Sequence, residues 1–163
     1  AVGEKAGVMK QDTDFTKPHR AKPAGKLSSF IRMTYYWVDY LIGMPYLLRK
    51  EVKAERYTIF DRYIFDFVVD PKRARISLPY WMRKMFARMV IQPQIVFVLN
   101  TEADVIYKRK QELELNEIKR QLDEFNKIES LCSNVVYIDA GQSVDEMTTQ
   151  AIKIIFDKFL NKI

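Results

Sequence analysis

Three short apolar runs, each ending abruptly at polar residues, constrain the fold of this chain more than any other feature. They cover residues 57–60, 95–99 and 135–138, and each is rich in β-branched or aromatic side chains. Runs of this length and composition predict strands that are buried on both faces. Roughly thirty residues of helical pattern separate successive runs, which is enough for a crossover between parallel strands. The sequence therefore predicts an α/β fold built on a parallel sheet.

The carboxyl ends of the three runs carry polar side chains that could form one site. Asp61 and Arg62 follow the first run, Asn100 and Thr101 follow the second, and residues 139–141 follow the third. Parallel strands bring such ends to one edge of the sheet, where open α/β sheets bind ligands. An adjacent acid and arginine suit a small anionic ligand with its metal or hydroxyl partner. A salt bridge from the end of the strand to a neighbouring helix explains the Asp-Arg pair equally well.

Length and charge limit the classes of partner. The 163 residues predict a single domain over residues 1–163, and the net charge of +6 favours anionic partners, namely phosphate compounds, nucleic acid or acidic lipid. Cys132 is the only cysteine, so no internal disulfide can form and a reducing cytoplasm is the simplest compartment. Its place just before a strand predicts a packing role.

The longest apolar stretch, residues 30–48, predicts an amphipathic helix laid on the sheet. Asp39 and Pro45 within it argue against a membrane span. The helix is expected to begin after a cap at Ser28 or Ser29 and to end near residues 50–54. The alternative is a role at a lipid surface, with these residues facing the head groups: Arg32, Arg49 and Lys50.

The remaining segments are expected to be loops and helices around the sheet. Residues 1–29 predict a basic loop region, and Pro71 is expected to prevent a long helix in residues 66–75. Residues 78–91 predict a helix with a core-facing methionine and aromatic stripe, and a long charged helix is expected from Glu102. Ser143 and Glu146 match a capping box for a last helix that covers the sheet. The basic residues of the loop region are Lys17, His19, Arg20, Lys22 and Lys26.

The order of these features resembles the C-terminal two-thirds of thymidylate-kinase-like P-loop kinases. The resemblance is closest to the subgroup often encoded with surface-polysaccharide genes, and it covers most of residues 17–163. It implies a three-layer α/β fold with a parallel sheet. The matching passages are Pro18–Lys26, Tyr35–Tyr36 with Asp39–Tyr40, Phe60–Tyr63, Asp66–Arg75 and Arg109–Leu113.

The resemblance implies ATP-dependent transfer of a phosphoryl group to a nucleoside monophosphate or a related small acceptor, with Mg²⁺. Asp61 would orient the acceptor or help to hold the metal, and Arg62 would clamp the acceptor's phosphate. The same resemblance assigns further residues to three parts of the site. They are Tyr63, Asp66, Arg73 and Arg75 for the acceptor, Arg109, Lys110 and Glu112 for a mobile lid, and Asp139, Ala140 and Gly141 for the loop against the adenine of ATP.

The chain departs from that family in one major respect. A P-loop needs Gly-x-x-x-x-Gly-Lys-Ser/Thr between a strand and a helix, and Gly3, Gly7 and Lys10 do not match this spacing. Asn100 stands where related sequences often carry Asp, which argues against metal contacts there. We expect a fragment, or a family member without its N-terminal third, that is inactive alone. A missing central strand would also leave exposed sheet edges, through which copies could associate or swap.

Two other function classes fit the sequence. The first is a non-catalytic module that binds nucleic acid or another polyanion, although the aromatic residues fall on core stripes and do not interleave with the basic residues. The second is a pure interaction or scaffold domain, which no positive feature supports. The basic residues expected to bind the polyanion in the first of these hypotheses are Lys72, Arg73, Arg75, Arg83, Lys84 and Arg88.

Overall fold

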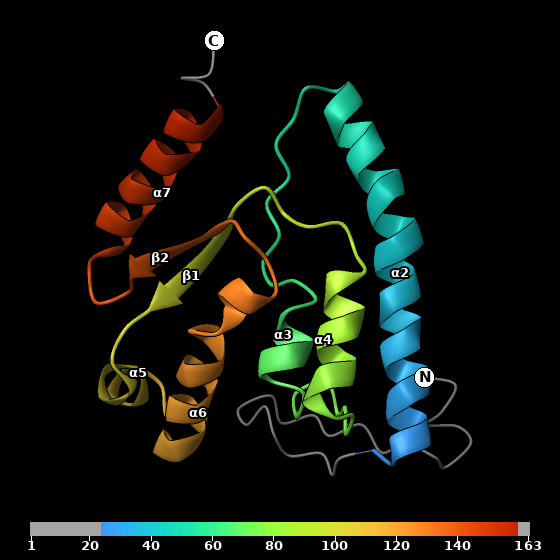
Figure 1. The fold of residues 1–163 in the computed structure, drawn as a ribbon. Helices are drawn as coiled ribbons and strands as arrows, with labels where there is room; N and C mark the ends of the chain where they lie inside the picture. Colours follow the sequence, from blue (N-terminus) through green and yellow to red (C-terminus); the bar gives the residue numbers. More distant parts are fainter. Residues whose placement is uncertain (1–23, 160–163) are drawn as a thin grey trace, which may run out of the picture.

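The structure is a computed structural model in which residues 24–159 are described (Figure 1). No helix within residues 24–159 combines the length and the apolar character needed to cross a bilayer. The helices and strands are α2 (Lys26–Lys53), α3 (Asp66–Val69), α4 (Tyr80–Arg88), β1 (Val96–Asn100), α5 (Ala103–Arg109), α6 (Leu115–Phe125), the 3₁₀ helix η1 (Ile128–Ser130), β2 (Val135–Asp139) and α7 (Val144–Phe159).

Two of the three predicted strands form, and they run in parallel. β1 pairs with β2 in a register that places Val96 opposite Val135 and Asn100 opposite Asp139. The connection between them contains α5 and α6, as expected for a crossover between parallel strands. In the view of Figure 1, α6 lies below the two strands and α7 above them. Residues 24–159 contain only this one pair of strands. The larger parallel sheet of a three-layer α/β fold therefore stays a prediction.

The prediction of a buried strand at residues 57–60 is wrong for this structure. The segment has no regular secondary structure, and the exposed fractions are 66% for Tyr57 and 86% for Ile59. A strand forms only when a neighbour accepts and donates its backbone hydrogen bonds. Within residues 24–159, β1 and β2 pair only with each other, so the segment remains outside the sheet despite its β-rich composition.

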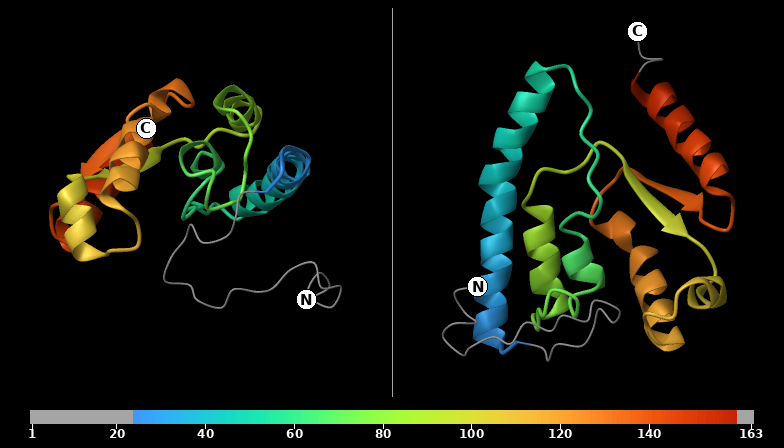
Figure 2. Two further views of the ribbon diagram at one scale, coloured as in Figure 1. Left: turned by 90° about the horizontal axis from the view of Figure 1, so that it is seen from below. Right: turned by 180° about the vertical axis from the view of Figure 1, so that it is seen from behind.

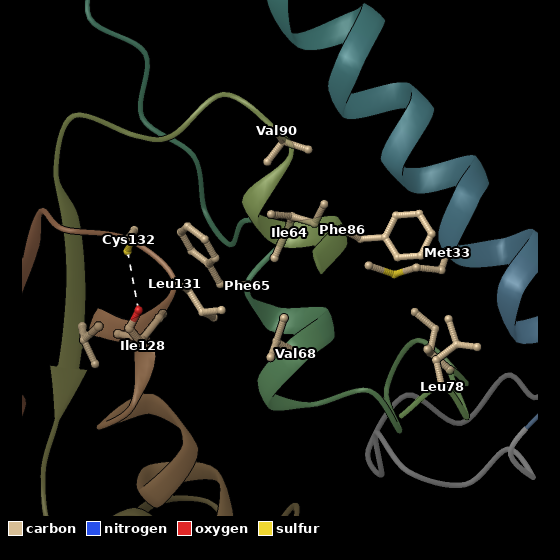
Figure 3. Close-up of a cluster of buried hydrophobic side chains, with 13 residues drawn as sticks. Met33, Ile64, Phe65, Val68, Leu78, Phe86, Val90, Ile128, Leu131 and Cys132 are labelled. Atoms are coloured by element: carbon tan, nitrogen blue, oxygen red, sulfur yellow. Dashed lines mark hydrogen bonds between the residues drawn. The ribbon is translucent and has the colours of Figure 1, made fainter. Parts of the chain in front are cut away.

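The hydrophobic core lies between β1 and helices α2, α3 and α4 and extends to the segment after α6 (Figure 3). Ile64 and Met33 are fully buried, and Phe65 lies beside Leu131 in the close-up. Cys132 is buried as predicted, and its thiol donates a hydrogen bond to the carbonyl oxygen of Ile128. The core therefore joins segments from both halves of the described chain.

Helix α2 packs on other helices and not on the sheet, which corrects the sequence expectation. The Phe86 ring of α4 meets the rings of Phe30 and Trp37 edge to face, with centroids 6.1 and 5.5 Å apart. Tyr36 stacks on Phe67 of α3 at 4.8 Å. Consequently α2 forms one side of the molecule, with α3 and α4 between it and the strands (Figures 1 and 2).

The start of α2 also differs from the prediction, whereas its end at Lys53 agrees with it. Gly25 occupies the N-cap position, so the helix begins within the predicted loop region. Ser29 is buried and does not cap the helix: its hydroxyl accepts a hydrogen bond from the backbone N–H of Ser77 and donates one to the carbonyl oxygen of Ala24. The other basic residues of that region, including His19, lie outside the described residues.

Three helical predictions need smaller corrections. The long helix expected from Glu102 is divided into α5 and α6, although no glycine or proline interrupts residues 110–114. The predicted core stripe of α4 is only half correct, because Phe86 is buried while Trp81 and Met85 are exposed.

Helix α7 has the predicted capping box, but none of its residues is fully buried. As expected, α3 is short and ends before Pro71.

Candidate functional site

An open hollow of about 910 Å³ lies at the carboxyl ends of β1 and β2. This is the edge at which open α/β sheets bind ligands. Its walls come from the strand ends, from the start of α5 and from one face of α6. The lining residues that the argument uses are Asn100, Val105, Lys119, Asp123, Asn126 and Asp139.

The loop after β2 is held in a defined conformation at the rim of this hollow. The Asp139 carboxylate accepts a hydrogen bond from the backbone N–H of Gly141 at 2.7 Å, and the N–H of Ala140 donates to the carbonyl oxygen of Asn100 at 2.8 Å. Arg109 of α5 donates to the carbonyl oxygen of Ala140 at 2.7 Å. A Cβ atom at Gly141 would lie only 2.9 Å from Asp139 Oδ1, so a larger residue here would displace the Asp139 carboxylate from its contact with the loop. Its own Asp139, the end of β1 and Arg109 of α5 therefore fix the loop.

One face of α6 supplies polar groups that the sequence reasoning missed. Lys119, Asp123 and Asn126 follow one another at spacings of four and three, so they share one face of the helix, and all three line the hollow. This spacing is visible in the sequence, but a charged helix face is usually solvated, so the pattern alone did not identify these residues. A cation, a carboxylate and an amide beside the apolar walls of Val105 and Leu122 suit a flat polar ligand with hydroxyl groups.

The predicted acceptor residues form a second cluster around the start of α3. Arg62 Nη1 and Asp66 Oδ2 form an ion pair at 2.8 Å. Burial raises the pKa of the Asp66 carboxyl, against the opposing charge of Arg62, and Arg73 adds a weaker opposing charge. Arg62 has a φ of 70°, which is uncommon for a residue with a side chain and directs the backbone into α3. The interpretation as a salt bridge to a neighbouring helix is thus realised for Arg62, because its partner Asp66 lies in α3, although the segment before Arg62 is not a strand.

Tyr63 has a clear structural role in the same cluster. Its hydroxyl donates a hydrogen bond to the carbonyl oxygen of Ile91, and its ring meets the Tyr40 ring edge to face at 5.0 Å. Burial, together with the nearby Tyr40, raises the pKa of the Tyr63 phenol to about 12. The ring therefore packs between α2 and the segment before β1, and this packing accounts for its position without a ligand.

The remaining predicted site residues lie around these two clusters. Asp61 is exposed just before Arg62. Arg75 has a φ of 56°, and its carbonyl oxygen accepts a hydrogen bond from the N–H of Ala24. Lys110 and Glu112 of the predicted lid form an ion pair at 2.6 Å in the connection between α5 and α6. Of the three predicted lid residues, Arg109 contacts the loop after β2, whereas Lys110 and Glu112 pair with each other.

The structure does not join the two clusters into one site. Helix α6 lies between α3, which carries Asp66, and α5, which ends at Arg109 (Figures 1 and 2). Of the three predicted strand ends, Asn100–Thr101 and Asp139–Gly141 meet at the hollow, whereas Asp61–Arg62 belongs to the other cluster. The prediction that all three strand ends lie at one edge of the sheet fails because residues 57–60 do not join the sheet. Asp61 is therefore not held at the edge that carries Asn100 and Asp139.

Most cations of the predicted polyanion surface are engaged in contacts within the chain. Arg83 donates hydrogen bonds to the carbonyl oxygens of Leu78, Phe67 and Val68. Both Lys84 and Arg88 donate to Ser130, and Lys72 pairs with Glu117. These contacts join α4 to α3 and to η1, and the loop after α3 to α6, so the basic residues contribute to the internal scaffold as well as to the surface charge.

Comparison with known proteins adds no relative: no family model, no curated protein and no solved structure matches this chain.

Proposed function

We propose that this chain is part of a nucleotide-kinase-like phosphotransferase and that the hollow at the carboxyl ends of β1 and β2 receives the nucleoside portion of ATP. The observation that carries the proposal is the hollow itself, because it combines parallel strand ends with hydrogen-bonding groups from α6. The acceptor would be a nucleoside monophosphate or a related small phosphate compound. A reducing cytoplasm, in keeping with the buried free Cys132, is the compartment that fits this role.

The residues around the hollow have separate tasks in this proposal. The loop Asp139–Gly141 supplies a fixed wall for the base, and Arg109, which holds that loop, would couple it to the lid. Lys119, Asp123 and Asn126 would bind the ribose hydroxyl groups and the base edge. Catalysis of phosphoryl transfer depends on positioning and on neutralisation of charge. The lid cations would act on the transferred phosphoryl group, and Arg62 and Arg73, which lie in the separate cluster at α3, would hold the phosphate of the acceptor.

The residues present agree with a Mg²⁺ ion that is held mainly by the nucleotide. No group of three or more metal-ligating side chains occurs in the described stretch 24–159. Mg²⁺ commonly takes one or two protein carboxylates and completes its shell with phosphates and water. Asp61, exposed before α3, is the carboxylate that the resemblance assigns to this role. When bound, the ion would neutralise charge on the phosphates.

The isolated chain of 163 residues is expected to show no measurable kinase or ATPase turnover. It contains no Gly-x-x-x-x-Gly-Lys-Ser/Thr motif to hold the transferred phosphoryl group. A coupled assay that detects ADP, run on the purified chain with ATP, Mg²⁺ and a panel of nucleoside monophosphates, checks this. Substantial turnover would show that another set of residues can hold the phosphates.

Binding of ADP tests the hollow directly. We expect binding in the millimolar range, because the proposed nucleoside contacts would act without a phosphate-binding loop. Substitution of Lys119 by glutamate should weaken it about tenfold, which corresponds to about 1.4 kcal/mol. The matched control is Lys108→Glu, an equal change of charge on an exposed residue of α5 outside the hollow. Isothermal titration calorimetry measures both variants.

Two results of this titration would count against the proposal. An equal loss in both variants would mean that Lys119 acts only through the net charge of the chain. Steeply salt-dependent binding of random oligonucleotides, with no preference for mononucleotides, would favour the polyanion-binding module instead.

A further inference from the structure

Six apolar side chains form a continuous stripe along α2. Their exposed fractions range from 39% at Val38 to 78% at Tyr46, and the stripe lies on the side of α2 opposite the buried Ser29 and Met33. Because α2 forms one side of the molecule, this face points away from the rest of the described chain (Figures 1 and 2). We call these residues the outer stripe: Leu27, Ile31, Tyr35, Val38, Ile42 and Tyr46.

An exposed apolar stripe of this kind needs an explanation. Scattered apolar side chains are normal on a surface, but a contiguous row is typical of an interaction site. The spacing of the stripe, at steps of three and four residues, is the pattern with which one helix packs against another. The partner surface is therefore expected to be helical.

We propose that the outer stripe is the interface of a homodimer in which two copies of the chain pack their α2 helices antiparallel. The steps between successive stripe residues are four, four, three, four and four, so the pattern is the same in both directions. Two antiparallel copies consequently place Leu27 opposite Tyr46, Ile31 opposite Ile42 and Tyr35 opposite Val38. Such a self-complementary surface fits the two-fold symmetry of most homodimers.

Two charges beside the stripe support the antiparallel orientation. Arg32 and Asp39 each come one position after a stripe residue and lie on the same flank of α2. In the antiparallel pair, Arg32 of each copy lies opposite Asp39 of the other copy, which gives two ion pairs at the edge of the interface. In a parallel pair of helices in register, the same positions would face the uncharged Leu27 and Thr34.

Both charged groups are available for these contacts. Asp39 is exposed and makes no hydrogen bond or ion pair with any residue between 24 and 159. Within the described part of the chain, the side chain of Arg32 makes one long contact, in which Nη1 lies 3.5 Å from the carbonyl oxygen of Ala74. A guanidinium has five N–H donors, so this contact leaves donors for a carboxylate across the interface.

The size of the stripe is sufficient for a dimer. Six such side chains on each copy would bury on the order of 1,200 Å² in total, at the lower end of the range for specific interfaces. A lipid surface is less well matched, because it favours a flank that is uniformly basic, and Asp39 interrupts this one. The interface also differs from the sheet-edge association expected from the sequence, because it lies on the opposite side of α3 and α4 from the strands.

The first test compares one substitution at two places in the full chain. Ile42→Lys introduces a charge within the outer stripe, and Ile59→Lys introduces the same charge in the unpaired segment before α3, where the isoleucine is also exposed. We expect the unmodified chain to be a dimer at micromolar concentration in sedimentation equilibrium. Ile42→Lys should raise the dissociation constant about 100-fold, whereas Ile59→Lys should leave it unchanged.

The second test uses charge reversal to check the orientation without disturbing the apolar contacts. Asp39→Arg and Arg32→Asp should each weaken self-association, because each variant places like charges opposite one another across the dimer axis. A mixture of the two variants restores opposite charges at both positions, so native mass spectrometry should show mostly heterodimers. Circular dichroism spectra like that of the unmodified chain would establish that the variants are folded.

The outcomes separate the proposal from its competitors. A monomeric unmodified chain, or a dimer that Ile59→Lys disrupts and Ile42→Lys does not, would overturn it. So would a monomer that sediments with vesicles of anionic lipid, since the stripe would then face a membrane. Folded single variants that give no excess of heterodimer in the mixture would refute the antiparallel arrangement.

Discussion

Replacement of Phe86 by alanine is expected to lower the free energy of unfolding by about 3–5 kcal/mol. Phe86 is only 5% exposed, and its ring contacts Phe30 and Trp37 of α2 edge to face. The substitution would leave a cavity at the junction of α2 and α4, and it would also remove two aromatic contacts. Because domains of this size are commonly stable by about 5–15 kcal/mol, the variant should be close to unfolding at room temperature.

Urea unfolding followed by circular dichroism measures this effect, with Trp81→Ala as the matched control. Trp81 lies on the same helix and loses an even larger side chain, but it is 63% exposed. We expect this control to change the stability by less than about 1 kcal/mol. Alanine has a higher helix propensity than either aromatic residue, so propensity cannot explain a loss. Equal losses in both variants would mean that the packing of Phe86 against α2 contributes no more than the contacts of an exposed side chain.

The contrast between Phe86 and Trp81 also shows how far the sequence could predict the fold. The spacing of apolar residues correctly predicted a helix here, and the capping box at Ser143 and Glu146 correctly predicted the start of α7. Both signals are local. The side of α4 that is buried depends on where α2 lies, and periodicity alone does not give this information when apolar residues surround much of the helix.

The prediction of the strands and of the candidate site from the sequence is limited in the same way, because it too depends on which segments become neighbours. The runs at β1 and β2 form strands because each is the other's partner, whereas residues 57–60 have equal strand character and no partner. The position of Asp61 and Arg62 depends on that missing pairing, so the sequence placed them at the wrong edge. The hollow was only half predicted: the loop Asp139–Gly141 was identified from the end of its strand, but Lys119 and Asp123 were not.

Glu117 is expected to provide about 2 kcal/mol of stability at neutral pH through its contacts with Lys72 and Arg120. Its carboxylate is 2.6 Å from Lys72 Nζ and 2.7 Å from Arg120 Nη2. Burial alone would raise the pKa of Glu117, but the hydrogen bonds and charges of Arg120 and Lys72 outweigh it and lower the pKa to about 2. Arg120 also donates to the carbonyl oxygen of Val69, so the contacts of Glu117 support the packing of α6 on α3.

The direction of the pH dependence follows from this lowered pKa. The folded chain holds the Glu117 proton less tightly than the unfolded chain, in which the pKa of this carboxyl has its usual value of 4.5. The stabilisation is therefore complete above pH 4.5 and is lost as the pH falls through about 2. We expect Glu117→Gln to be less stable than the unmodified chain by about 2 kcal/mol at neutral pH, and we expect this difference to shrink steadily as the pH approaches 2.

Urea unfolding of both proteins at a series of pH values measures the effect. The control is Glu129→Gln, an equal change of charge at an exposed position in η1. It should alter the stability by less than about 0.5 kcal/mol at every pH. A difference between Glu117→Gln and the unmodified chain that stays constant down to low pH would mean that the glutamine disturbs packing, and that the ion pairs with Lys72 and Arg120 do not stabilise the chain.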